Sequence, residues 1–84
     1  MTESLLLHEI DRMLDQIDGE LISRSRVVDD LLDMRLAAPQ LPAFVRTVDV
    51  ALENIPGKST VTKDWWMTSL ADLRDAAQLA TVAS

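Results

Sequence analysis

The chain has 84 residues and carries 14 acidic against eight basic side chains, which gives a net charge of −6. This length predicts one domain over residues 1–84 with a modest hydrophobic core. The absence of cysteine excludes disulfides and thiolate metal sites, and a single histidine excludes a histidine-rich zinc site within one chain. We therefore expect no cofactor, no metal and no catalytic residue, as in a protein that is not an enzyme.

The charge pattern also bears on partners and on compartment. Nucleic-acid-binding domains usually carry a basic surface, whereas Lys58 and Lys63 are the only lysines and the arginines are scattered among acids. Direct binding of nucleic acid is therefore not expected. No apolar run approaches the roughly 18 residues of a membrane span, and nothing resembles a signal peptide. Without cysteine the composition suits a reducing compartment, and we expect a cytoplasmic protein.

The first predicted element covers residues 5–36, which contain no proline and one glycine, Gly19. Apolar side chains recur there at steps of three and four, which predicts one apolar face on a helix. A continuous helix of this length would be about 48 Å long. The stripe consists of Leu6, Ile10, Met13, Leu14, Ile17, Leu21, Val28, Leu31 and Leu32.

The stripe breaks once, at Arg24. If the helix is continuous, Arg24 forms a polar layer in the seam, and Glu20 four residues earlier supports continuity. Gly19 opposes it by about 1 kcal/mol relative to alanine. In this arrangement Arg24→Leu should keep or raise stability. The alternative is that two helices meet near Ser23 and Ser25, with a serine capping the second helix.

At a rise of 1.5 Å per residue, a helix over residues 5–36 is about 48 Å long. The rest of the chain is too short to cover a helix of that length. A second copy is expected to supply the missing surface, so the sequence predicts a helical homodimer. Trp65 joins the interface candidates because tryptophan is enriched at binding hot spots. The candidates are Ile10, Leu14, Ile17, Leu21, Arg24, Val28, Leu31 and Trp65.

Two shorter helices follow. Prolines 39 and 42 end the first arm near Ala37 or Ala38 and place Pro42 in the first turn of a helix that runs to about Asn54. Residues 58–61 read as a loop, and Thr62 caps a last helix over residues 63–80. The predicted fold is a small all-α helical bundle. It consists of a long N-terminal helix, either straight or kinked near Arg24, followed by two shorter helices. The apolar faces of the two shorter helices are Phe44, Val45, Val48, Leu52 and Ile55, and Trp66, Leu70, Leu73, Ala77 and Ala80.

Two acidic pairs suggest a possible chemistry. Asp15-x-x-Asp18 and Asp30-x-x-Asp33 resemble the E-x-x-E and E-x-x-D pairs of MazG-type nucleotide pyrophosphatases, although this chain has aspartate where that family has glutamate. The resemblance implies a magnesium-dependent nucleotide hydrolase. An acidic surface is also compatible with a nucleic-acid-mimicking inhibitor of the phage type. A solvated acidic face is the ordinary explanation, so the sequence favours a small acidic protein–protein interaction or regulatory module.

Overall fold

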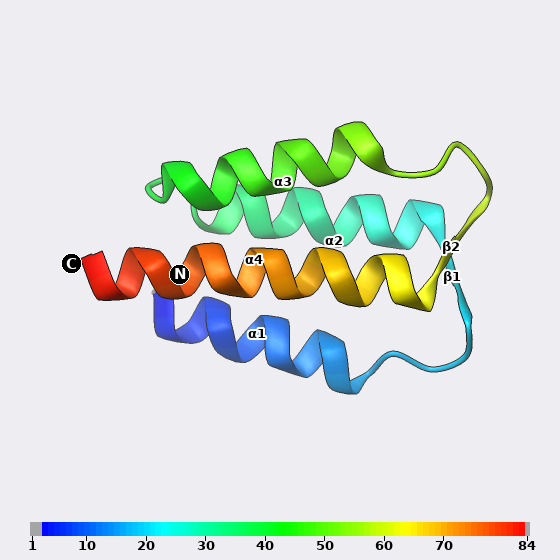
Figure 1. The fold of residues 1–84 in the computed structure, drawn as a ribbon, viewed down its shortest axis with the longest axis horizontal. Coiled ribbons are helices and arrows are strands. Elements are labelled where there is room, and N and C mark those ends of the chain that lie inside the picture. Colours follow the sequence, from blue (N-terminus) through cyan, green and yellow to red (C-terminus); the bar gives the residue numbers. More distant parts are fainter. Residues whose placement is uncertain (1–2, 84) are drawn as a thin grey trace.

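A computed structural model describes the backbone of residues 3–83 and the side-chain burial of residues 5–79. Within these residues, four helices run alternately in opposite directions, and two short strands meet at one end of the bundle (Figure 1). The all-α class is confirmed in outline, while the small sheet was not predicted. The elements are α1 (Glu3–Asp15), β1 (Leu21–Ser23), α2 (Arg24–Ala37), α3 (Pro42–Asn54), β2 (Thr60–Thr62) and α4 (Lys63–Ala83).

Residues 5–36 do not form one long helix, so that prediction was wrong. Helix α1 ends at Asp15, and α2 begins only at Arg24, after a loop and a strand. Gly19 in the loop has a φ of +80°, a left-handed conformation that an α-helix does not contain. The alternative of two helices meeting near Ser23 places the start of α2 correctly. It misses the strand, and Ser23 makes no side-chain capping hydrogen bond.

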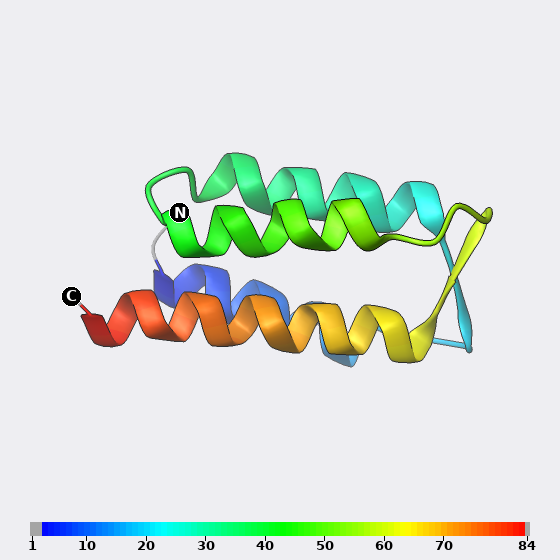
Figure 2. The same ribbon diagram turned by 45° about the horizontal axis from the view of Figure 1, so that its top comes forward.

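The two strands form an antiparallel ladder that joins the α1–α2 connection to the α3–α4 connection, and Figure 2 shows them crossing at the end of the bundle. Only the middle pair faces inward: Val61 is buried and Ile22 is half-buried, whereas the other four side chains are exposed. The ladder therefore closes one end of the core. Its cross-strand pairs are Leu21 with Thr62, Ile22 with Val61, and Ser23 with Thr60.

Arg24 anchors the start of α2 to the loop before β2. Its backbone N–H donates to the Ser59 carbonyl at 3.0 Å, and its Nε donates to the Pro56 carbonyl at 2.9 Å. At the other end of the ladder, the Lys63 N–H donates to the Glu20 carbonyl at 2.8 Å. Arg24 is therefore not a polar layer in a helix–helix seam, which corrects the sequence-based interpretation.

The helices pack in the spatial order α2, α3, α4, α1, with close contact between each successive pair. Two ion pairs join neighbouring helices: Arg35 of α2 with Asp49 of α3 at 2.9 Å, and Arg74 of α4 with Asp11 of α1 at 2.8 Å. Each pair is about half exposed, so it contributes about 0.2–1 kcal/mol at most. Helices α1 and α2 are not among the pairs that pack closely.

The two later helices agree with the predictions. Helix α3 has the predicted bounds, with Pro42 in its first turn and with Phe44 and Val48 buried. Thr62 caps α4, because its Oγ1 accepts a hydrogen bond from the Trp65 N–H at 3.2 Å. Helix α4 continues to Ala83, beyond the predicted end. Trp66, Leu70, Leu73 and Ala77 are buried as predicted, whereas the side chain of Ala80 lies outside the described residues.

The orientation of α2 differs from the predicted stripe. Val27, Leu31 and Met34 are the buried residues of this helix, whereas the stripe placed Val28 and Leu32 inside. Adjacent residues on a helix lie about 100° apart, so the two choices present different faces to the core. The buried residues follow one another at steps of four and three residues. Leu31 is the one position that belongs both to this buried face and to the predicted stripe.

The neighbouring leucines of α2 test this orientation. Leu31 is fully buried and Leu32 is 42% exposed. Leu31→Ala should lower the free energy of unfolding by about 2–5 kcal/mol, because it removes buried methyl groups and leaves a cavity. Leu32→Ala is the matched control and should cost much less. Urea unfolding of both variants measures the difference, and equal costs would contradict the orientation of α2.

The Arg24 anchor gives a second prediction. Arg24→Leu should lower the free energy of unfolding by about 1.5–3 kcal/mol, because a charged donor is removed from a partly buried carbonyl. Arg46→Leu, at an exposed position of α3, controls for placing a leucine where an arginine stood. If urea unfolding finds Arg24→Leu as stable as the wild type, the side-chain anchor does not hold the ladder.

Candidate interaction groove

The side of the bundle between α1 and α2 is open and contains two adjoining hollows that share Met13 and Asp30. We call this surface the α1–α2 groove. Its walls are α1 and α2, its floor includes Trp66 of α4, and β1 closes one end. It is lined by Glu9, Arg12, Met13, Gln16, Ile17, Asp18, Leu21, Ile22, Ser23, Arg26, Asp30, Asp33, Met34, Ala37 and Trp66.

The α1 wall carries an ion pair between Glu9 and Arg12, which lie one helical turn apart. Arg12 donates hydrogen bonds to both carboxylate oxygens of Glu9. These bonds and the charge of Glu9 raise the pKa of Arg12, and the charge of Asp30 on the facing helix raises it further. Glu9, on the same helix, is therefore the main partner of Arg12.

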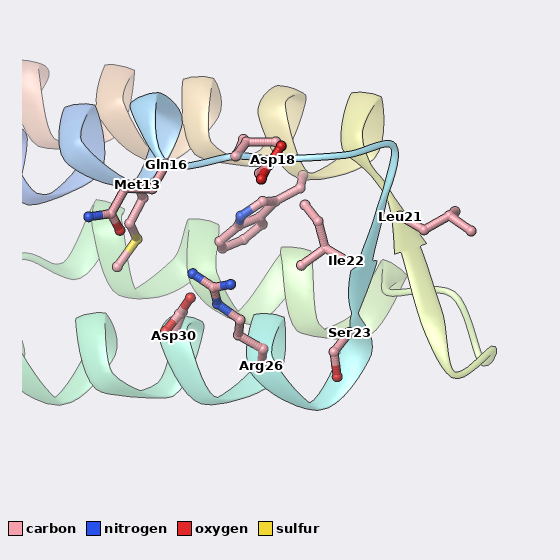
Figure 3. Close-up of a pocket in the computed structure, with 10 residues that line it drawn as sticks. Met13, Gln16, Asp18, Leu21, Ile22, Ser23, Arg26 and Asp30 are labelled. Atoms are coloured by element: carbon pink, nitrogen blue, oxygen red, sulfur yellow. The ribbon is translucent and has the colours of Figure 1, made fainter.

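The α2 wall carries Arg26 and Asp30, four residues apart on one helical face. Figure 3 shows both side chains extending from α2 into the hollow, with Met13 and Gln16 facing them from the end of α1. Burial raises the pKa of Asp30, and Arg26 opposes this shift. The nearby acids Asp33, Asp29 and Glu9 raise the pKa of Asp30 further. Ionisation of the half-buried Asp30 carboxylate therefore costs free energy in the folded chain.

The floor is apolar. Trp66 is buried but lines the hollow, and Met13, Ile17 and Ile22 are half-buried around it. The hollow next to β1 has a volume of about 170 Å³. The adjoining hollow has a volume of about 270 Å³. Each hollow alone is smaller than the usual pocket for a small ligand, about 300–1,000 Å³, and each has room for one or two side chains of a partner.

The sequence-predicted interface residues are divided by the structure. Ile10 and Leu31 are fully buried within the chain, so they offer no surface to a second copy. Leu14 and Val28 are half-buried, and Arg24 is bound to the β2 loop. Ile17 and Leu21 alone lie in the α1–α2 groove, where Leu21 is 62% exposed.

Trp65 lies in a separate hollow between α3 and α4, with Val50 and Asp72 on its walls. It is half-buried against the core, and so it is not brought to the same surface as Ile17 and Leu21. Sequence reasoning missed Arg26, Met34 and Trp66 as groove residues. The available signal was their spacing on helices, but the groove exists only once α1 and α2 are placed in space.

The two acidic pairs are not arranged as the pyrophosphatase resemblance implies. Helix α1 ends at Asp15, so Asp18 lies in the loop and the first pair does not share a helix. The second pair, Asp30 and Asp33, does lie on α2. Among residues 5–79, no group of three or more histidine or acidic side chains is placed to hold a metal ion.

Comparisons of this chain with protein-family models, with curated proteins and with solved structures find no match. Among the described helices, none combines the length and the apolar character needed to cross a membrane.

The raised pKa of Asp30 predicts a pH-dependent stability. Because its pKa is higher in the folded chain than the ordinary value of 3.8, ionised Asp30 destabilises the folded state. This cost is fully present above the folded-state pKa and disappears as the pH falls below 3.8. Asp30→Asn should therefore raise the free energy of unfolding at pH 7, and the gain should shrink as the pH approaches 3.8.

Urea unfolding at several pH values measures this gain. Asp29→Asn, at the exposed neighbouring position, controls for the loss of one negative charge from an acidic chain. Identical pH profiles for the two variants would show that the groove does not disfavour ionised Asp30.

Proposed function

We propose that this chain is a small acidic protein–protein interaction module and that the α1–α2 groove is its binding surface. The observation that carries the proposal is the open side of the bundle. Four-helix bundles usually bury the inner faces of all their helices in one core. Here α1 and α2 leave an apolar floor with Trp66 and Met13 between charged walls.

The residue types of the groove favour binding of a protein. Aromatic residues, methionine and arginine are enriched in protein interfaces, and the groove presents Met13, Arg12 and Arg26 above the buried side chains of Trp66 and Met34. Methionine side chains are flexible and polarisable, so they adapt to the shape of a partner. The apolar floor supplies contact area, and the charged walls supply orientation.

Two alternatives are supported less well. A MazG-like hydrolase needs two acidic pairs on helices, and Asp18 lies outside α1. A mimic of nucleic acid needs a row of exposed negative charge. Arginines interrupt the acids of this chain, since Glu9, Asp11 and Asp49 each pair with one.

The homodimer remains a prediction, but its original reason no longer applies because the chain's own helices cover Ile10 and Leu31. Leu32 and Leu36, one turn apart on α2 and 42% and 76% exposed, are the surface that favours self-association. Light scattering at micromolar concentration should then give about twice the chain mass of 9.4 kDa, and Leu36→Ser should shift the mass toward the monomer. A wild-type monomer would contradict the dimer and would not bear on the groove, which Leu32 and Leu36 do not line.

Position-specific photo-crosslinking in the source cells tests the proposed binding surface. A benzophenone amino acid at Gln16 or Arg26, both exposed in the groove, should crosslink to another protein. The same amino acid at Val50, which is 50% exposed between α3 and α4, is the control and should not. Crosslinks at Val50 alone would move the binding surface, and no crosslink at any position would contradict the proposed function.

A further inference from the structure

We propose that the α1–α2 groove receives one amphipathic α-helix of a partner protein, and that basic side chains flank the apolar face of this helix. The inference rests on the proposed function and adds the chemical class of the partner. Three observations carry it: the length of the groove, the placement of its apolar residues, and the balance of charge on its walls.

The groove has the dimensions of a helix site. On α2 its lining residues run from Arg26 to Ala37, which corresponds to about 17 Å at 1.5 Å per residue. A partner helix of about three turns fills this length. It would lie against α1 and α2 as a further helix of the bundle, with β1 at one end of the groove.

Apolar contacts are available along the groove rather than at one point. Ile17 and Ile22 lie in the hollow next to β1, Ala37 lies in the adjoining hollow, and Met13 belongs to both. All four are half-buried, above the buried side chains of Trp66 and Met34. A helix bound in a groove inserts side chains at positions i, i+3 or i+4, and i+7. Such a stripe would begin beside Ile17 and Ile22 and continue past Met13 toward Ala37.

The net negative charge of the walls favours basic residues on either side of the partner helix's apolar face. Glu9, Asp18, Asp30 and Asp33 give four negative charges against two from Arg12 and Arg26, a local balance of −2. Arg12 is bonded to Glu9, and Arg26 faces Asp30.

The remaining acids, Asp18 and Asp33, are exposed on the rims. Lysine or arginine beside them would gain attraction while staying hydrated, and the chain charge of −6 would speed association. A second copy of this acidic chain lacks that complementarity.

The test uses three synthetic helical peptides of 16 residues, each with the same number of leucines. The first carries a leucine stripe flanked by lysines, the second the same stripe flanked by glutamates, and the third a scrambled stripe with lysines. Titration into the full chain, followed by amide chemical shifts, should give binding of the first peptide with shifts at Met13, Gln16, Arg26 and Asp30. The other two peptides should bind at least tenfold more weakly.

Two charge-reversal variants separate the groove from general attraction to an acidic protein. Asp18→Lys with Asp33→Lys changes the rims of the groove, whereas Glu53→Lys with Asp75→Lys makes the same change in net charge at exposed positions of α3 and α4. The groove variant should lose at least tenfold in affinity for the first peptide, and the control variant should lose less than threefold.

Several outcomes would overturn the inference: equal losses in the two variants, shifts confined to α3 and α4, or no preference for lysine flanks. Groove shifts that depend on protein concentration without peptide would assign the groove to a second copy and would also overturn it. If crosslinks form at Gln16 and Arg26 while the peptides show no preference, the proposed function stands and the basic-helix partner does not.

Discussion

The short antiparallel ladder between β1 and β2 is the constraint on which the rest of this structure depends. It ties together two connections that are about 40 residues apart in the chain, and the Lys63 and Arg24 amides extend its register beyond both ends of the strands. Arg24 adds a side-chain bond to the Pro56 carbonyl. The backbone and side chain of one residue therefore hold the same loop from two directions.

The connection that contains β1 also lines the open side of the bundle. Residues 16–23 leave the α1 helix, turn at Gly19 in a left-handed conformation, and run as β1 before α2 begins. Helices α1 and α2, which this connection joins, are not among the pairs that pack closely. The same segment then lines the groove through Ile17, Leu21 and Ile22, so the feature that interrupts the helix also builds the candidate binding surface.

The later half of the fold was predictable because its signals are local. Pro42 and Pro56 bracket α3, the Thr62 hydroxyl caps α4, and the buried face of α4 follows a clear helical spacing. The break in the first half was not predictable, because Ile17 and Leu21 keep the spacing of a helix across the loop. Three-residue strands are too short to show alternation. The dipeptide Asp18-Gly19 is a turn signal, and the interruption of the apolar stripe at Arg24 was a second local indication of the break.

The buried face of α2 was predicted wrongly and the groove was not predicted, for different reasons. Val27 and Val28, like Leu31 and Leu32, are adjacent apolar pairs, so periodicity alone does not choose between two faces of α2. The groove depends on the relative placement of α1, α2 and Trp66 of α4. No spacing within a single helix contains that information.

The most direct test of this account is an NMR measurement of proton contacts between the two connections. In an antiparallel ladder, residues of non-hydrogen-bonded pairs bring their Cα atoms within about 4.5 Å. The bonds from Lys63 to Glu20 and from Arg24 to Ser59 make Leu21–Thr62 and Ser23–Thr60 such pairs. The account predicts strong Hα–Hα nuclear Overhauser effects for both pairs. An unbroken series of helical i to i+3 contacts through residues 16–24, without these effects, would contradict it.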